Sequence, residues 1–301
     1  MGGIAFVFSG QGDQHPGMGQ ELCNRYPVAA EMFRLFDRLR PGTSAQCFTG
    51  TAEELRETKN AQPCLFAMEL AAAAVLLDQG IRPEAAAGFS LGELAAAAMA
   101  GVFSAAEGFS LVCRRAGLMQ AEAEKTQTSM AAVLGLTPEQ VGAICAKHDR
   151  LYPVNFNCPG QITVSGPVSE LPSLCQAVKD AGGGALPLKV GGAFHSPFMR
   201  PAAAAFGEEL KKLELRTPEI PLYSDVTALP YGDPASLLAE QIASPVRWEA
   251  LIRNMIAAGI DTFLEVGPGK TLCNMIRKTD PAVRTFCVSD MDRLIEEVLS
   301  C

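Results

Sequence analysis

The chain has 301 residues, 48% of them hydrophobic and 19% charged, which allows one large or two modest globular domains and excludes a disordered chain. A formal net charge of -8 without a long basic run argues against nucleic acid as the main ligand. The ten cysteines form no Cys-x-x-Cys pair and no Cys/His cluster with metal-ligand spacing, so we expect reduced thiols in a cytoplasmic protein and no metal site.

The N-terminus lacks a basic segment and has only one strand's length of apolar residues, so we expect no signal peptide. We also expect no membrane-spanning segment, because charged residues, glycine or proline interrupt each apolar stretch.

The first third of the chain predicts alternating strands and helices. A short apolar run at 4–8 predicts a buried strand, and a glycine-rich turn follows at 9–17. Helical periodicity covers 31–39 and 65–78, and a further helix is expected at 105–124. The turn lacks the Lys-Ser/Thr ending of a phosphate-binding Walker A loop, but a loop after a central strand is still a common ligand site.

The middle of the chain has a pattern of its own, β-α-β-β-α-β, which is typical of a ferredoxin-like unit. We therefore predict a small domain at 126–190, inserted into a large α/β domain with a parallel sheet that comprises 1–125 and 191–301. The expected strands lie at 130–134, 152–156, 161–165 and 185–190, and the expected helices at 138–146 and 171–181.

The last third returns to the large domain. Strands are expected at 221–226 and 262–266, helices at 201–213, 237–243 and 248–258, and a last main helix after the tight turn at 267–270.

One serine is singled out by the segment around it. Residues 88–92 read Gly-Phe-Ser-Leu-Gly after an apolar run and before an alanine-rich helical run, which fits the G-x-S-x-G turn between a strand and a helix. With the helix beginning at Ser90, the N–H of Leu91 would stabilise an oxyanion formed beside the serine. The alternative, Ser90 as an ordinary helix N-cap, remains open from this stretch alone.

A serine nucleophile needs a base, and the chain has three histidines. His148 lies in a charged run and is expected to be solvated, whereas His15 lies in an exposed loop that would hold a base poorly. His195 lies in a loop with apolar residues on both sides, and we favour it as the base over a structural core histidine. No acidic residue stands out as its partner, so a backbone carbonyl is one possible orienting acceptor.

Several short motifs then follow one another in an order that resembles a known family. They are residues 10–12 (Gly-Gln-Gly), 88–93 (Gly-Phe-Ser-Leu-Gly-Glu), Arg115 with 119–120 (Met-Gln), 157–161 (Asn-Cys-Pro-Gly-Gln), 192–197 (Gly-Ala-Phe-His-Ser-Pro), 244–248 (Ser-Pro-Val-Arg-Trp) and 265–269 (Glu-Val-Gly-Pro-Gly). From residue 4 to about residue 276, the chain resembles the malonyl-CoA:acyl carrier protein transacylases of fatty acid synthesis and the related acyltransferase domains of polyketide synthases.

The resemblance implies an α/β-hydrolase-like large domain and a ping-pong transfer in which Ser90 carries the malonyl group and His195 is the base. It also implies an oxyanion hole from the backbone N–H groups of Gln11 and Leu91, and a main-chain carbonyl of Gln241 that orients His195.

The resemblance further implies that Arg115 binds the free malonyl carboxylate, which a guanidinium can pair with through two parallel hydrogen bonds. Position 115 matches the family's R-x-x-x-M-Q, whereas Arg114 is expected on the solvated face. In the polyketide acyltransferases that the chain resembles, an Ala-Phe-His form of the histidine motif goes with malonyl rather than methylmalonyl substrates, and residues 193–195 have this form. Asn157 and Gln161 are candidate substrate-binding residues, although turn chemistry explains their motif equally well. Phe89 departs from the family, which usually has histidine there.

The implied partners are malonyl-CoA and a phosphopantetheinylated acyl carrier protein, with no cofactor, no membrane and a monomeric enzyme. Two other functions stay open. An acyl hydrolase or thioesterase would use the same Ser90 and His195 with water as the acceptor. A non-catalytic subunit that binds a carrier protein is disfavoured by the joint presence of Ser90, His195, Arg115 and Gln11.

Overall fold

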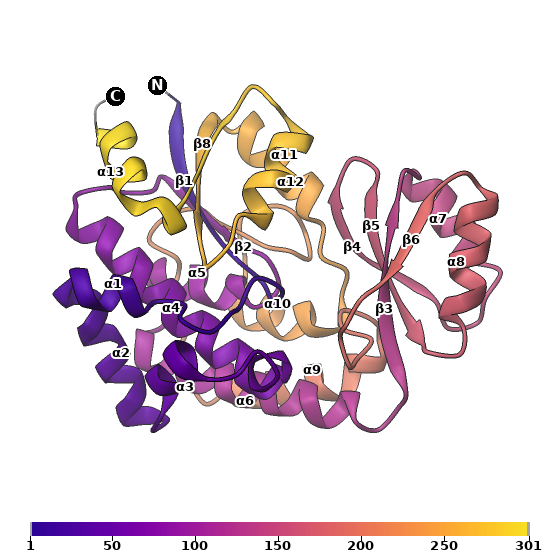
Figure 1. The fold of residues 1–301 in the computed structure, drawn as a ribbon, viewed down its shortest axis with the longest axis horizontal. Helices are drawn as coiled ribbons and strands as arrows, with labels where there is room; N and C mark the ends of the chain where they lie inside the picture. Colours follow the sequence, from indigo (N-terminus) through magenta and orange to yellow (C-terminus); the bar gives the residue numbers. More distant parts are fainter. Residues whose placement is uncertain (1, 300–301) are drawn as a thin grey trace.

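The computed structural model describes residues 2–299, and two β-sheets organise it (Figure 1). The larger sheet is parallel, with the strand order β7 (Leu222–Tyr223), β2 (Ala85–Gly88), β1 (Gly3–Phe8), β8 (Ile260–Val266) and β9 (Arg284–Cys287).

The central strand β1 explains the layers. Phe6 and Phe8 belong to the large hydrophobic cluster on one face of the sheet, and Ala5 and Val7 belong to a second cluster on the other. Because both faces are covered, β1 is an unbroken apolar run without alternation. Helices α11 (Trp248–Ala257) and α12 (Thr271–Thr279) cover the second face. The helices that contribute to the first cluster are α1 (Gln20–Arg25), α2 (Pro27–Leu39), α3 (Thr43–Thr49), α4 (Thr58–Asp78), α5 (Gly92–Met99), α6 (Ala105–Ala123), α9 (Arg200–Leu210), α10 (Pro234–Glu240) and α13 (Met291–Leu299).

The smaller sheet is antiparallel and lies to the right in Figure 1. Its order is β4 (Tyr152–Cys158), β5 (Gln161–Pro167), β3 (Thr128–Leu134) and β6 (Gly184–Pro187). With α7 (Pro138–Cys145) and α8 (Leu171–Asp180) it completes the predicted β-α-β-β-α-β unit, which has its own apolar cluster. The fold class is confirmed. The exact domain limits at 126 and 190 stay a proposal, which the position of this unit supports.

Several predicted boundaries were wrong. The helix expected at 65–78 starts at Thr58 and contains Pro63, and the strand expected at 221–226 comprises only Leu222–Tyr223. Helices α1, α3 and α13 and strand β9 were not predicted, because they are short or lie on the surface. Short 3₁₀ turns occupy Glu54–Arg56, Pro197–Met199, Gln241–Ala243 and Val288–Asp290.

Helix α4 corrects the expectation that no apolar stretch reaches membrane-spanning length. It has 21 residues and passes that test by length and composition, because Pro63 lies inside the helix instead of interrupting it. However, 83% of its most apolar window is buried inside the fold, which is typical of the core helix of a globular domain.

Candidate active site

Ser90 lies at the sharp turn between β2 and α5. Its φ of 55° is in the left-handed region that non-glycine residues rarely adopt. A Cβ at Gly88 would overlap the backbone of Gly92, and a Cβ at Gly92 would overlap the carbonyl of Phe8. The two glycines are therefore required by the close approach of strand and helix. The predicted turn is present, but α5 begins at Gly92 and not at Ser90, because Ser90 itself makes the turn.

His195 meets Ser90 across the chain. The Nε2 atom of His195 lies 2.7 Å from Oγ of Ser90, and its Nδ1 atom lies 3.0 Å from the carbonyl oxygen of Gln241. A carbonyl only accepts hydrogen bonds, so Nδ1 carries the proton and Nε2 is free to accept the serine proton. This is the geometry that a serine nucleophile and its general base require.

The other two histidines lie elsewhere. His15 is exposed, and its Nδ1 atom is 3.0 Å from the carbonyl oxygen of Asp13. His148 is not fully solvated as expected: its side chain is 20% exposed, and Nδ1 lies 3.8 Å from a carboxylate oxygen of Glu170. The charged run around His148 is folded against the start of α8, which sequence composition does not reveal.

The loop that carries His195 is anchored by the small sheet. Oγ of Ser165 donates a hydrogen bond of 2.9 Å to the carbonyl of Phe194, and the N–H of Ala193 donates one of 3.0 Å to Oγ1 of Thr128. His195 is buried and has a φ of 60°. The antiparallel sheet therefore positions a residue whose partner, Ser90, belongs to the parallel sheet.

Arg115 is fully buried beside the dyad. Its Nη2 atom lies 3.4 Å from Oγ of Ser90 and donates a hydrogen bond of 2.6 Å to Oε1 of Gln241. Its Nη1 atom donates one of 2.8 Å to Oε1 of Gln62, whereas its Nε–H has no partner among the described residues. Arg114, as expected, is exposed.

Two buried carboxyl groups behind the serine were not predicted. Glu93 accepts hydrogen bonds from the N–H of Asp225, from the hydroxyl of Tyr231 at 2.6 Å, and from the side-chain amide of Gln241. Oδ2 of Asp225 accepts a bond of 2.7 Å from the N–H of Ser90. Glu93 follows Gly92 in the sequence motif, but nothing in the sequence shows that Asp225 and Tyr231 reach it.

These buried charges shift one another's protonation. Burial raises the pKa of both Glu93 and Asp225. Burial lowers the pKa of Arg115 to about 10, although Glu93 and Asp225 oppose the shift. Burial, with the Arg115 charge as the second cause, lowers the pKa of His195 to about 4. His195 is therefore neutral at pH 7, as a general base must be.

Gln11 lies in the loop after β1, at the mouth of the site. Its Oε1 atom accepts a hydrogen bond of 3.1 Å from Gln62, the same residue that binds Arg115. Gln62 therefore connects the β1 loop to the guanidinium, a role that sequence reasoning missed. Leu91, the other predicted oxyanion residue, is buried directly after Ser90.

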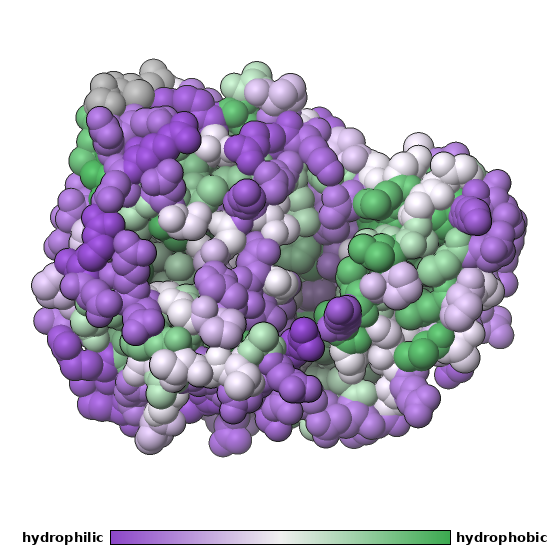
Figure 2. All heavy atoms as spheres, in the orientation of Figure 1, coloured by the Kyte–Doolittle hydropathy of each residue, from purple (hydrophilic) through white to green (hydrophobic). Residues whose placement is uncertain are grey.

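A cavity of about 200 Å³ opens between the β1 loop, the small sheet and α12. Gln11, Phe89, Asn157 and Gln161 line it, so two of the three predicted substrate-binding residues share this cavity, whereas Ser90, His195 and Arg115 are not among its lining residues. Asn157 is buried and its Oδ1 atom has no hydrogen-bond partner among the described residues. Figure 2 shows the surface hollowed between the large body and the small domain.

Phe89, which stands where the family that the chain resembles usually has histidine, lies against apolar side chains. Its ring packs edge to face with Trp248, with 5.5 Å between the ring centroids. An aromatic pair of this geometry stabilises the wall of the cavity.

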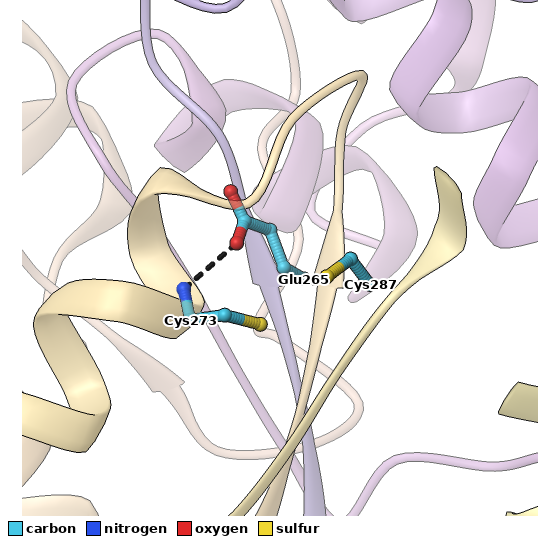
Figure 3. A group of neighbouring side chains, drawn as sticks. All are labelled: Glu265, Cys273 and Cys287. Atoms are coloured by element: carbon cyan, nitrogen blue, oxygen red, sulfur yellow. Dashed lines mark hydrogen bonds between the residues drawn. The ribbon is translucent and has the colours of Figure 1, made fainter. Parts of the chain in front are cut away.

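Among the described residues, one further group of potential ligand side chains comes together, away from Ser90: Glu265, Cys273 and Cys287 (Figure 3). Both carboxylate oxygens of Glu265 accept backbone N–H bonds at the start of α12, at 3.1 Å from Leu272 and 2.7 Å from Cys273. The carboxylate is thus accounted for as a cap of α12.

Comparison with known proteins identifies the family. Residues 5–292 match the family model described as an acyl transferase domain. The chain belongs to this acyltransferase family. It is 37% identical over 303 residues to the malonyl CoA-acyl carrier protein transacylase of Bacillus subtilis, covering 98% of this chain and 96% of that protein.

Other members of the family extend the likeness to polyketide synthesis. The chain is 38% identical over 282 residues to part of the polyketide synthase GfsB of Streptomyces halstedii, covering 90% of this chain and 5% of that protein. A solved complex of a type II polyketide acyl carrier protein with its malonyl-transacylase matches with a TM-score of 0.95 at 30% identity, covering 99% of this chain and 100% of that one. The chain is thus an acyltransferase with the transacylase fold.

Proposed function

We propose that this chain transfers the malonyl group from malonyl-CoA to the phosphopantetheine thiol of an acyl carrier protein, in fatty acid biosynthesis. The observation that carries the proposal is the buried guanidinium of Arg115, 3.4 Å from the serine oxygen that His195 contacts at 2.7 Å. A cation at this depth suits an acyl group that ends in a carboxylate, and it penalises one that leaves the charge unpaired.

In the first half-reaction, Oγ of Ser90 attacks the thioester carbonyl and passes its proton to Nε2 of His195. The N–H groups of Gln11 and Leu91 stabilise the oxyanion, and the carbonyl of Gln241 holds the protonated ring. Because the pKa of His195 is lowered to about 4, its imidazolium is a strong acid that readily protonates the leaving CoA thiolate. CoA leaves, and malonyl remains as an ester on Ser90.

In the second half-reaction, the carrier-protein thiol gives its proton to His195 and its sulfur attacks the ester carbonyl. The bond between the carbonyl carbon and Oγ of Ser90 then breaks, His195 returns the proton to Oγ, and the malonyl group leaves as a thioester of the carrier protein. Asn157 and Gln161, which line the cavity, bind the acyl or thioester group in both steps.

Arg115 also links substrate choice to base strength. Its charge is one cause of the low pKa of His195. A malonyl carboxylate bound to Arg115 offsets that charge, so the pKa of His195 rises and the ring becomes a better base. An acetyl group leaves the charge uncompensated.

The finer assignments belong to the same proposal. Ser90, His195 and Gln241 are the catalytic residues, and the enzyme acts without a cofactor, as a monomer, in the cytoplasm. Polyketide synthesis is a second candidate pathway, and the likeness of this chain to part of the polyketide synthase GfsB supports it.

The test is the intact mass of the protein after brief incubation with malonyl-CoA or acetyl-CoA, with Ser90→Ala as control. We expect a malonyl adduct that the control lacks and that a phosphopantetheinylated carrier protein removes. Rapid release of free CoA without an adduct would indicate a hydrolase, and an acetyl adduct of equal yield would contradict the role of Arg115.

A further inference from the structure

Two cysteines lie together at an edge of the parallel sheet, away from Ser90. Cys273 lies in the first turn of α12, and Cys287 ends the edge strand β9. The two Sγ atoms and a carboxylate oxygen of Glu265 lie within 4.8 Å of one another. In Figure 3 both thiols lie beside the Glu265 side chain, whose carboxylate points to the N–H of Cys273. A disulfide joins sulfurs at about 2.05 Å, so the thiols need to approach by less than about 3 Å.

The two thiols differ in access. Cys273 is fully buried, and its Sγ atom lies 3.3 Å from the carbonyl oxygen of Phe286. Cys287 is half-buried and lines a surface cavity of about 160 Å³ together with Arg277, Asp290 and Arg293. A small molecule therefore reaches Cys287 from solvent, whereas Cys273 lies behind it.

The groups around Cys287 favour its thiolate. The neighbouring Cys273 thiol is the main cause that lowers the pKa of Cys287 to about 7, and Ser289 and Arg277 add to this effect against burial and the charge of Glu265. The same interaction between the two thiols is the main cause that raises the pKa of Cys273. One thiol of the pair is thus a nucleophile at neutral pH, and the other stays protonated beside it.

A second cysteine pair in the molecule lacks this access. Cys47 and Cys64 interact between α3 and α4, but both are fully buried in the main core. Both pairs bring two thiols close together, but only the pair of Cys273 and Cys287, of these two, has a thiol that solvent reaches.

We propose that Cys287 is an oxidation site for small hydroperoxides and that Cys273 resolves the product as a disulfide. The Cys287 thiolate attacks one peroxide oxygen, so that an S–O bond forms, the O–O bond breaks, and hydroxide (with hydrogen peroxide as the oxidant) leaves and takes up a proton as water. The Cys273 sulfur then attacks the sulfenic sulfur, the S–S bond forms, and hydroxide leaves with the Cys273 proton as a second water. The two thiols lose two electrons, and the peroxide gains them.

Trypsin makes the test direct, because cleavage after Lys270, Arg277, Arg284 and Arg293 places the cysteines in separate peptides, 271–277 and 285–293. The reduced full chain is treated with a few equivalents of hydrogen peroxide, its remaining thiols are alkylated, and the digest is analysed by mass spectrometry. We expect the two peptides to be joined, and dithiothreitol to separate them.

Three variants complete the test. Cys273→Ser should leave a Cys287 sulfenic acid that dimedone traps, and Cys287→Ser should abolish both products. Cys175→Ser removes a half-buried cysteine on α8 and should leave the linked peptides unchanged. Thermal unfolding checks that each variant is folded, and Cys273→Ala replaces Cys273→Ser if the hydroxyl destabilises the core. The proposal is overturned if folded wild-type protein yields no linked peptides, or if Cys175 is oxidised as fast as Cys287.

Discussion

The two residues that we propose as catalytic, Ser90 and His195, are held in place in different ways. Ser90 and His195 both have positive φ, at 55° and 60°. The turn at Ser90 is imposed mainly by its own segment, in which Gly88 lies against the backbone of Gly92, although Asp225 also accepts a hydrogen bond from the N–H of Ser90. The loop at His195 depends on side chains and carbonyls from distant strands and turns. The comparison teaches that the position of Ser90 depends mainly on local backbone geometry and that of His195 on long-range hydrogen bonds.

Removal of either side chain should have the largest effect. We expect Ser90→Ala and His195→Ala each to lower kcat by about 10³–10⁶-fold, because neither half of the dyad works alone. The measurement is malonyl transfer from CoA to a carrier protein, with thermal unfolding as the control for folding. A His195→Ala enzyme that keeps a tenth of the activity would show that another group acts as the base.

The local half of the comparison is tested by Gly88→Ala. The new methyl group overlaps the backbone of Gly92 and Glu93 in the same segment, so the elbow must shift, and we expect the free energy of unfolding to fall by about 3–5 kcal/mol. Urea denaturation measures this change. The matched control is Gly117→Ala on α6, where a Cβ meets no atom within 4 Å and should stabilise the helix by about 0.5–1 kcal/mol.

Replacement of Arg115 tests the buried charge that lies beside Ser90 and lowers the pKa of His195. Arg115→Met should lower kcat/KM for malonyl-CoA by about 10²–10³-fold, through loss of a charged hydrogen-bonding pair, and should change acetyl transfer far less. Arg115→Lys keeps the charge but loses the two-pronged geometry, so malonyl transfer should still fall. Equal losses for malonyl and acetyl would contradict carboxylate recognition.

The pH dependence of kcat/KM should shift in a definite direction in the Arg115 variants. Burial and Arg115 lower the pKa of His195 to about 4 from its ordinary 6.5, so the acidic limb of kcat/KM lies low in the wild type. Arg115→Met removes one cause of the lowered pKa of His195, so the acidic limb of kcat/KM should move to higher pH.

The same pKa shift affects folding stability. Between pH 4 and 6.5 the unfolded chain binds a proton at His195 that the folded chain does not bind, so this histidine makes the folded state less stable as pH falls.

Ser165→Ala tests the long-range hydrogen bonds that hold the loop of His195, and it should have a smaller effect than the variants above. It removes the 2.9 Å hydrogen bond to the carbonyl of Phe194 beside the base, and we expect about 1 kcal/mol of destabilisation with a several-fold lower kcat. Ser173→Ala is the control, because its exposed hydroxyl donates a hydrogen bond to the carbonyl of Glu170, just before α8 and away from the loop. If both variants have equal activity, the small sheet does not position His195 through this bond.

The smallest effect is expected at Phe89. Phe89→His should change the rate or acyl selectivity by less than about tenfold, because the side chain packs on Trp248 at the cavity wall and is not one of the proton-transfer groups that we propose. Transfer assays with malonyl-CoA and acetyl-CoA measure the change. A collapse of activity would show that this position takes part in catalysis.

Residues whose roles depend on their neighbours in the chain were predicted well. Residues 88–92 indicated a strand, a turn and a helix from local sterics alone, and only the first helical residue was wrong. The ferredoxin-like unit was predicted because each element has its own hydrophobic period. The resemblance to a family supplied Gln11, Arg115 and Gln241, which periodicity does not single out.

Residues whose roles depend on distant partners could not be predicted. Gln62 looks like one polar residue in an apolar helix, yet it joins Gln11 to Arg115. Asp225 and Glu93 are 132 residues apart, and only folding places both behind Ser90. Their pKa shifts result from burial, which is a property of the packed structure.

By itself, the sequence determined the two-sheet architecture and the turn that presents Ser90, because hydrophobic period and glycine sterics act over a few residues. Only the tertiary structure decided which groups anchor the loop of His195, which groups surround Arg115, and which thiol faces solvent. Hydrogen bonding, desolvation and charge coupling depend on distance in space, and residues far apart in the chain acquire that distance only when the sheets and helices pack.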